Sequence, residues 1–243
     1  MRQYGLIGFP LTHSFSQNYF RQKFSDDGIT DAEFLNFPIA KISEVKMIFD
    51  DHPFLKGLAV TIPYKKAIID YIDETSYEVK RTGACNCVQI KAGKKAGFNT
   101  DIAGFETSFK KNLQPYHTKA LILGTGGAAA AVEYVLKKNS IAYSFVSRRP
   151  AENRFGWDDI DEKILDEFKV IINCTPLGTY PNTDEKPGLP YHFLTPGHYL
   201  FDLVYNPPQT QFLLEGEKHG CYIQNGYEML VIQAEENWKI WNS

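Results

Sequence analysis

Three features of the sequence predict an α/β fold in two parts. Strand-like and helix-like segments alternate along most of the chain, which is typical of α/β proteins. A short apolar run at residues 119–123 enters a glycine turn and is followed by an alanine-rich helical segment, the usual beginning of a nucleotide-binding βαβ unit. The length of 243 residues suffices for one large domain or two small ones.

Apolar spacing predicts the elements of the first hundred residues. Spacing of two favours strands, and spacing of three to four favours helices. The strands are expected over residues 3–9, 33–38, 57–62, 88–90 and 96–99. The helices are expected over residues 14–24, 42–49 and 64–72. The last two strands would pair through a turn at residues 92–94.

A second series of elements begins near residue 104. Helices are expected over residues 102–111, 128–138 and 227–241. Strands are expected over residues 119–123, 142–146, 170–173 and 199–204. Residues 174–197 are rich in proline and glycine and predict loops. This half therefore repeats the strand–helix–strand pattern of a Rossmann-like domain.

Composition excludes several classes of function. The net charge is −3, with 26 basic and 29 acidic residues and no basic stripe, which argues against nucleic acid as the main partner. The four cysteines lack C-x-x-C spacing and the six histidines form no H-E-x-x-H motif, so we expect no metal site. No uncharged apolar stretch approaches 18 residues, so we expect a soluble, cytoplasmic protein without a membrane span.

The glycine turn matches the G-x-G-x-x-A pattern of dinucleotide-binding proteins. Gly124 would make the tight turn, Gly126 would let the backbone approach a pyrophosphate, and a small residue would let helix and strand pack closely. The helix that begins at Gly127 and Ala128 would direct its N–H groups and positive dipole end at the phosphates. The alternative is a tight strand–helix turn that binds no ligand.

The cofactor preference follows from residues about 20 positions after the turn. NAD enzymes usually place an acidic residue there to hold the ribose 2′-hydroxyl. This chain has Ser147, Arg148 and Arg149 instead. A guanidinium group suits a 2′-phosphate, so we predict NADP(H) rather than NAD(H). The alternative is a solvated basic loop.

Polar residues of the first half have less specific local interpretations. Lys65 follows an apolar strand, and a lysine there is more often a solvated surface charge than a catalyst. Asp101 could cap the helix that follows it, and Asn86 could be a turn residue. Spacing alone therefore leaves a catalytic role for these residues open.

The order of eight short motifs is more specific than any one of them. They are SFS at 14–16, VTIPYK at 60–65, GACN at 83–86, NTD at 99–101, GTGGA at 124–128, NCTPLG at 173–178, DLVYNP at 202–207 and GYEML at 226–230, followed by Gln233. In this order they resemble the shikimate dehydrogenase family over nearly the whole chain. The resemblance implies two α/β domains with the active site in the cleft between them. A substrate-binding domain would comprise residues 1–103 and 226–243, and a Rossmann-like NADP-binding domain residues 104–225.

The resemblance also implies an activity and a set of site residues. The reaction would be the reversible, NADPH-dependent reduction of 3-dehydroshikimate to shikimate in aromatic amino acid (chorismate) biosynthesis. Lys65 would be the catalytic acid and base, with Asp101 as its partner. The substrate would contact Ser14, Ser16, Thr61, Asn86, Asp101, Tyr205 and Gln233. The cofactor would contact Gly124, Gly126, Gly127, Ala128, Ser147, Arg148, Arg149, Thr175 and Gly226. The protein would be a monomer or homodimer.

Some residues depart from the family pattern, and several other functions stay open. Gln17 stands where the family usually has proline, and Cys87 where it commonly has threonine. Thr179 stands where methionine often follows the N-x-T-P-x-G motif of the family. The alternatives are a quinate/shikimate dehydrogenase with broader substrate or NAD use and a thioester-type reductase with Cys85 or Cys87 as nucleophile. A methylenetetrahydrofolate dehydrogenase fits the motifs around Asn86 and Asp101 poorly. A non-catalytic NADP-binding regulator of the same fold is the remaining alternative.

Overall fold

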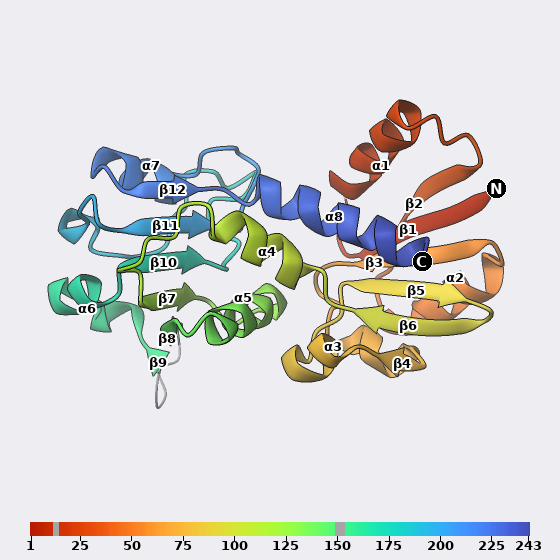
Figure 1. Cartoon of the computed structure of the whole chain (residues 1–243), viewed down its shortest axis with the longest axis horizontal. Coiled ribbons are helices and arrows are strands. Elements are labelled where there is room, and N and C mark those ends of the chain that lie inside the picture. The colour runs from red at the N-terminus through yellow and green to blue at the C-terminus, as the bar shows by residue number, and fades with distance from the viewer. Residues whose placement is uncertain (12–14, 149–153) are drawn as a thin grey trace. The chain divides into compact units, whose positions relative to one another are not determined.

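The computed structural model describes residues 1–11, 15–148 and 154–243, and it divides into two compact units (Figure 1). Unit 1 comprises residues 1–100 and 233–243, and unit 2 comprises residues 101–232. The chain therefore passes from one unit to the other twice. The second passage lies within the last helix, α8 (Tyr227–Trp241). Two predicted site residues, Ser14 and Arg149, lie outside the described residues.

Unit 1 is built on a mixed six-stranded sheet with the order β2-β1-β3-β5-β6-β4 (Figure 1). Its strands are β1 (Arg2–Gly8), β2 (Ala32–Pro38), β3 (Leu55–Val60), β4 (Glu74–Thr75), β5 (Cys87–Lys91) and β6 (Lys94–Phe98). The first three are parallel to one another, whereas β5 is antiparallel to both β3 and β6. The hairpin of β5 and β6 confirms the expected pairing, and Ala92 and Gly93 in its turn have positive φ.

Helices of unit 1 are short and flank the sheet. They are α1 (Phe15–Asp26), α2 (Val45–Asp51) and α3 (Tyr77–Thr82), with the 3₁₀ segments η1 (Ile42–Glu44) and η2 (Ala67–Tyr71). The expected helix over 64–72 was wrong, because only η2 forms there. The β-branched and aromatic residues of this segment lose rotamer freedom in an α-helix. Ile68 is fully buried, so packing against the core holds this segment in its short 3₁₀ conformation.

The end of α8 completes an aromatic core in unit 1. Trp241 stacks on Tyr4, with ring centroids 5.3 Å apart, and its indole N–H donates to the Val88 carbonyl at 3.1 Å. A Cβ atom on Gly57 would lie 2.3 Å from the Trp241 ring, so only glycine permits this close approach. The core of this face also includes Phe20, Phe24 and Phe34.

Unit 2 is built on a parallel six-stranded sheet with the order β12-β11-β10-β7-β8-β9. Its strands are β7 (Lys119–Leu123), β8 (Ala142–Val146), β9 (Arg154–Phe155), β10 (Val170–Asn173), β11 (Tyr199–Asp202) and β12 (Tyr222–Gln224). The expected bounds of β7, β8 and β10 are confirmed to the residue. All-parallel sheets are covered by helices on both faces, and unit 2 follows this rule.

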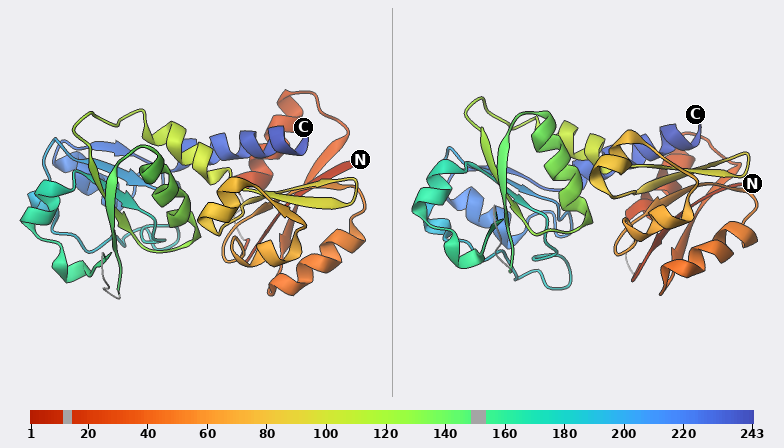
Figure 2. Two further views of the ribbon diagram at one scale, coloured as in Figure 1. Left: turned by 60° about the horizontal axis from the view of Figure 1, so that its bottom comes forward. Right: turned by 90° about the horizontal axis from the view of Figure 1, so that it is seen from below.

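Helices of unit 2 lie on both sides of its sheet (Figure 2), and two hydrophobic clusters contain the side chains that pack between them and the strands. One includes residues of α4 (Asp101–Phe109), α5 (Gly127–Lys138) and Met229 of α8. The other includes residues of α6 (Glu162–Glu167), α7 (Gln211–Lys218) and the 3₁₀ segment η4 (Tyr191–Phe193), and Trp157 of the 3₁₀ segment η3 (Trp157–Asp159) packs against it. The sequence pattern predicted α4, α5 and α8 but neither α6, α7 nor β12.

No helix among the described residues is both long enough and apolar enough to cross a membrane.

Glu106 links α4 to the end of α5 through two lysines. Its carboxylate lies 2.7 Å from both Lys110 and Lys138. Burial opposes ionisation, but hydrogen bonds from these lysines and Asn139 outweigh it and lower the pKa of Glu106 to about 2. The pKa is below its ordinary value of 4.5, so this stabilisation is present above pH 4.5 and lost as pH falls through about 2.

Glu106→Gln is expected to lower the free energy of unfolding by about 1 kcal/mol at pH 7, because both lysine partners are about half exposed and screened by solvent. The loss relative to the original chain should shrink as pH falls towards 2. Urea unfolding at pH 7 and pH 3 measures both effects, with the exposed Glu185→Gln as control. An equal loss at the two pH values would contradict the ion-pair explanation.

Candidate active-site residues

The substrate residues predicted in unit 1 lie at one edge of its sheet. This edge is formed by the ends of β1, β3 and β6 and by the beginning of β5. The Val60 N–H donates to the Asn86 carbonyl at 2.9 Å, and the Asn86 N–H donates to the Phe98 carbonyl at 3.1 Å. Asn86 is therefore fixed by its backbone between the ends of β3 and β6.

Thr61 and Lys65 follow β3 at the same edge. The Thr61 methyl group lies against Gly8, where a Cβ atom would be 2.4 Å from it. Lys65 is half-buried, and its backbone carbonyl accepts from the Cys85 N–H at 2.7 Å. The backbone of Lys65 is thus held beside the segment that precedes Asn86. Ser16 is the second residue of α1 and is half-buried.

A buried network of neutral side chains joins this edge to α8. It consists of Asn86, Thr100, Gln233 and Asn237, all at most 8% exposed. The Thr100 N–H donates to Asn86 Oδ1 at 2.7 Å, and the Thr100 hydroxyl donates to Asn237 Oδ1 at 2.7 Å. Gln233 Oε1 accepts from Asn86 Nδ2 at 3.4 Å and from Asn237 Nδ2 at 3.3 Å. The sequence predicted Asn86 and Gln233 as site residues, but it missed Thr100 and Asn237.

The strand order of unit 2 defines its own ligand edge. The chain runs outward from β7 through β8 to β9, then returns to the other side of β7 at β10. Open α/β sheets bind ligands at the carboxyl ends of the strands, where the strand order reverses. This point lies between β7, which ends before Gly124, and β10, which is followed by Cys174 and Thr175.

Two predicted cofactor residues lie side by side at this point. Gly124 has φ +93°, and a Cβ atom on it would lie 3.0 Å from the Thr175 methyl group. A side chain at Gly124 would therefore be strained and would also displace Thr175. Thr175 itself is fixed by its N–H and hydroxyl, which donate to Asn173 Oδ1 at 3.0 and 2.6 Å.

The beginning of α5 has room for a phosphate group. Gly126 is the N-cap of α5, is exposed, and offers no side chain to the N–H groups of the first turn. A Cβ atom on Gly126 would meet no atom within 4 Å. Gly127 and Ala128 form the half-buried first turn. This geometry fits the backbone binding of a pyrophosphate predicted from the glycine turn.

Ser147 and Arg148 directly follow β8, beside β7 in the sheet. Ser147 is half-buried, and its N–H donates to the Phe155 carbonyl at 3.0 Å, whereas Arg148 is exposed. Gly226 is buried, and a Cβ atom there would lie 2.2 Å from the Leu203 carbonyl oxygen. This close backbone approach is itself sufficient reason for glycine at 226. Burial raises the pKa of the half-buried Tyr205.

Asp202 is the centre of a second buried network, at the carboxyl end of β11. It is fully buried and accepts from Asn173 Nδ2 at 2.9 Å, the Val204 N–H at 3.0 Å and the Thr210 hydroxyl at 2.5 Å. Burial raises the pKa of Asp202 to about 6, although these hydrogen bonds oppose the shift. Because Asn173 also binds Thr175, Asp202 supports the loop next to the glycine turn. The sequence placed Asp202 in a motif without giving it a role.

Asp101 is the first residue of α4 in unit 2 and is 5% exposed. A buried carboxylate at the beginning of a helix benefits from the positive end of the helix dipole. Its predicted partner Lys65 belongs to unit 1. The pairing of the two remains a prediction.

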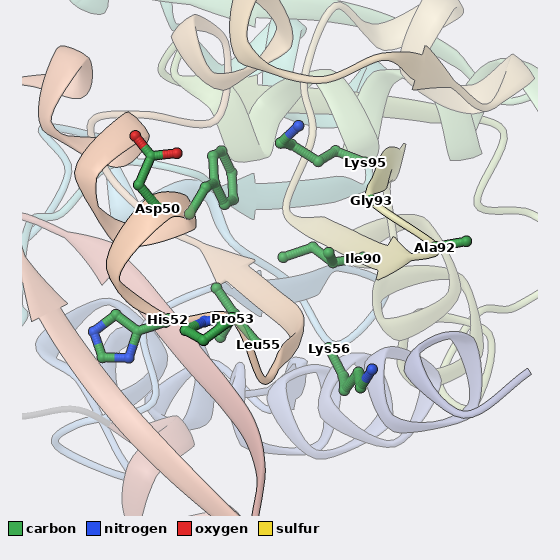
Figure 3. Close-up of a pocket in the computed structure, with 10 residues that line it drawn as sticks. Asp50, His52, Pro53, Leu55, Lys56, Ile90, Ala92, Gly93 and Lys95 are labelled. Atoms are coloured by element: carbon green, nitrogen blue, oxygen red, sulfur yellow. The ribbon is translucent and has the colours of Figure 1, made fainter.

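A separate depression of about 330 Å³ lies on unit 1 (Figure 3). Its lining includes Phe49, His52, Lys56, Ile90 and Lys95. Figure 3 shows Lys56 and Lys95 on separate sides of the depression, so their charges do not converge. No predicted site residue lines it.

Comparison with known proteins identifies the family. The family description "Shikimate dehydrogenase substrate binding domain" matches residues 6–88. Shikimate dehydrogenase (NADP(+)) of Staphylococcus aureus strain Newman is 35% identical, over 99% of this chain and 92% of that protein. The chain belongs to the shikimate dehydrogenase family. The predicted family and the predicted α/β fold class are therefore confirmed.

Solved structures of shikimate dehydrogenases share the fold of this chain. The enzyme of Thermus thermophilus in complex with NADP(H) and shikimate is 26% identical, covers 99% of this chain and 93% of its own, and has a TM-score of 0.87. The enzyme of Listeria monocytogenes in complex with shikimate and NAD is 26% identical, covers 100% of this chain and 92% of its own, and has a TM-score of 0.88. The two complexes thus contain different nicotinamide cofactors.

Proposed function

We propose that this chain catalyses the reversible, NADPH-dependent reduction of 3-dehydroshikimate to shikimate, a step of aromatic amino acid (chorismate) biosynthesis. The supporting observation is the edge of unit 1, where neutral amide and hydroxyl groups surround the strand ends beside Lys65. A small ring with several hydroxyl groups and a carboxylate needs such fixed polar partners. The relatives named above are called shikimate dehydrogenases, and this chain matches them over nearly their whole length.

Lys65 is proposed as the acid that protonates the developing alkoxide when the ring ketone is reduced. Its ammonium group would stabilise the negative oxygen and then donate a proton to it. In the reverse direction, a neutral Lys65 would accept the hydroxyl proton. Asp101 would orient the lysine and bind a neighbouring hydroxyl group. The proposed contacts of the substrate are Ser14, Ser16, Thr61, Asn86, Tyr205 and Gln233.

Unit 2 is proposed to bind NADP(H), which supplies the hydride when bound. The backbone of Gly124, Gly126, Gly127 and Ala128 would hold the pyrophosphate, because the first turn of α5 has available N–H groups and open space at Gly126. Ser147, Arg148 and Arg149 would hold the 2′-phosphate. Thr175 and Gly226 would lie near the remainder of the cofactor. Unit 1 would then act as the substrate domain and unit 2 as the cofactor domain.

The test is the absorbance of NADPH during incubation with 3-dehydroshikimate. We expect NADPH oxidation with this substrate and NADP⁺ reduction with shikimate. Shikimate and quinate should each be assayed with NADP⁺ and with NAD⁺, because the Listeria relative was solved with NAD. Preferred use of quinate with NAD⁺ would favour the quinate/shikimate alternative. NADPH binding without turnover of any of these substrates would favour a regulator.

Arg148→Ala is expected to raise the KM for NADPH about tenfold or more, since a charged hydrogen bond to the 2′-phosphate contributes roughly 1.5–3 kcal/mol. The KM for NADH, which lacks this phosphate, should change little. Steady-state kinetics with both cofactors measure the two effects. An unchanged KM for NADPH, with NADH used equally well by the original chain, would contradict the assignment.

A cysteine nucleophile is disfavoured by the burial of the two candidates. Cys85 and Cys87 are fully buried. Burial raises the pKa of the Cys87 thiol well above its ordinary value, so the reactive thiolate is suppressed. Burial thus argues against thioester chemistry at these cysteines.

We further propose that the protein is a monomer or homodimer in the cytoplasm. All four cysteines lie in the described ranges, and none forms a disulfide, which suits a reducing compartment. Size-exclusion chromatography with light scattering would measure the oligomeric state.

A further inference from the structure

We propose that Asn237 is a positioning residue that fixes the orientation of the Gln233 amide, so that Gln233 donates a hydrogen bond to an oxygen of the substrate. This inference rests on the proposed function, in which Gln233 contacts the substrate. Asn237 lies one turn after Gln233 on α8, and it is 1% exposed. Neither the motifs nor the composition of the chain pointed to Asn237.

The orientation of the whole network follows from one backbone group. The Thr100 N–H can only donate, and it lies 2.7 Å from Asn86 Oδ1. This contact fixes which end of the Asn86 amide carries the oxygen. Asn86 Nδ2 must then be the end that faces Gln233 Oε1 at 3.4 Å and the Thr100 hydroxyl oxygen at 3.0 Å.

The same direction continues through the hydroxyl group of Thr100. The hydroxyl proton has two acceptors within reach, Asn237 Oδ1 at 2.7 Å and Asn86 Oδ1 at 3.2 Å. Because Asn86 Oδ1 already accepts from the Thr100 N–H, we assign the proton to the shorter contact with Asn237. Asn237 Nδ2 is then left as the donor to Gln233 Oε1 at 3.3 Å. Two amide N–H groups therefore converge on the oxygen of Gln233.

This convergence determines what Gln233 can offer a ligand. A reversed Gln233 amide would place its own NH₂ group against two other NH₂ groups, and buried donors without acceptors are unfavourable. The oxygen of Gln233 is thus directed at the network, and its nitrogen is directed away from it. Gln233 is therefore set to donate to a substrate hydroxyl or carboxylate oxygen.

Asn237→Asp is the most informative variant, because it preserves size while replacing the donor to Gln233 with an acceptor. An ionised carboxylate there would attract the Gln233 NH₂ group and reverse its amide. At pH 8 we expect the Kd for shikimate to rise at least tenfold, with the Kd for NADP⁺ changed less than twofold. Burial at this position should raise the pKa of the introduced carboxyl group. As pH falls towards 5, the group should therefore begin to protonate and donate again, so the loss of shikimate affinity should shrink.

The measurement is titration calorimetry with the full chain at several pH values. Glu236→Gln is the matched control, because it exchanges a carboxylate for an amide at the neighbouring position of α8, outside the network. A ratio of Kd values near that of the control would overturn the inference. A large ratio that does not change with pH would also overturn it, because a purely structural defect would behave in this way.

Loss of NADP⁺ binding would indicate that Asn237→Asp does not fold. In that case, a second pair of variants tests whether the network orients Gln233. Thr100→Val removes the hydroxyl link but keeps the backbone N–H, whereas Thr100→Ser keeps both. We expect weaker shikimate binding in the first and near-normal binding in the second. Equal affinities in the two would overturn the inference. If the original chain neither binds nor oxidises shikimate, the proposed function itself fails.

Discussion

Lys65→Ala is expected to lower kcat by about 10²–10⁴-fold with only a modest change in the KM for 3-dehydroshikimate. The reason is that the proposed proton donor acts on the oxygen only as negative charge develops there, so its loss affects the transition state more than substrate binding. Steady-state NADPH oxidation measures both constants. Lys66→Ala is the matched control, because Lys66 is the exposed neighbour of Lys65.

The outcome of this experiment separates two roles for Lys65. Turnover within a few-fold of normal would exclude Lys65 as the proton donor, whatever the fate of KM. A large rise in KM with unchanged kcat would instead assign Lys65 to substrate binding alone. Neither result would affect the family assignment, which depends on similarity over the full chain.

Asp202→Ala is expected to destabilise unit 2 by about 3 kcal/mol or more. The change removes the shared acceptor of Asn173, Val204 and Thr210 and leaves their buried donors without it, and each such donor costs about 1–3 kcal/mol. Asp202→Asn preserves size and one acceptor oxygen, so its cost should be much smaller at pH 7. Thermal unfolding of the three proteins would measure this order of stability.

The pH dependence of the Asp202→Asn comparison has a definite sign. The pKa of Asp202 is about 6 in the folded protein and 3.8 ordinarily, so the folded state holds its proton more tightly. The resulting stabilisation is fully present below pH 3.8 and is lost as pH rises through about 6. Relative to Asp202→Asn, the original chain should therefore lose about 2–3 kcal/mol between pH 4 and pH 7. A difference independent of pH would contradict the raised pKa.

The sequence predicted the elements whose apolar pattern and boundary signals agreed. The strands β7, β8 and β10 and the helix α8 occupy the expected residues, because each has a clear period and a distinct beginning. The glycine turn between β7 and α5 was equally clear. The segment over 64–72 was misjudged because local spacing cannot reveal that Ile68 is fixed by the core.

Helix α7 was missed although its signal was present. Thr210 caps it by accepting from the Leu213 N–H at 3.4 Å, and such a cap followed by apolar residues can be recognised in a sequence. Helix α6 is similarly capped by Asp161, which accepts from the Ile164 N–H at 2.9 Å. Both are short helices that follow irregular segments, so their apolar pattern spans too few residues to be distinct.

Buried polar residues were the least predictable part of the site. Thr100 and Asn237 are partners across 137 positions of sequence, and no periodic pattern connects them. Asn173 and Asp202 are likewise joined only because β10 and β11 are neighbours in the sheet. Asn86 and Gln233 were found through family motifs, whereas Asn237 belongs to none and required the three-dimensional arrangement.

The aromatic core beneath the end of α8 also has a consequence for protein synthesis. Tyr4, Phe20 and Phe34 are translated before unit 2, whereas Ala234 and Trp241, which belong to the same core, are translated after it. The apolar side chains of unit 1 that α8 covers therefore stay exposed until residues 101–232 have been made. Nascent chains with such exposed surfaces are substrates for chaperones. A chain truncated before residue 233 would lack the part of α8 that completes unit 1.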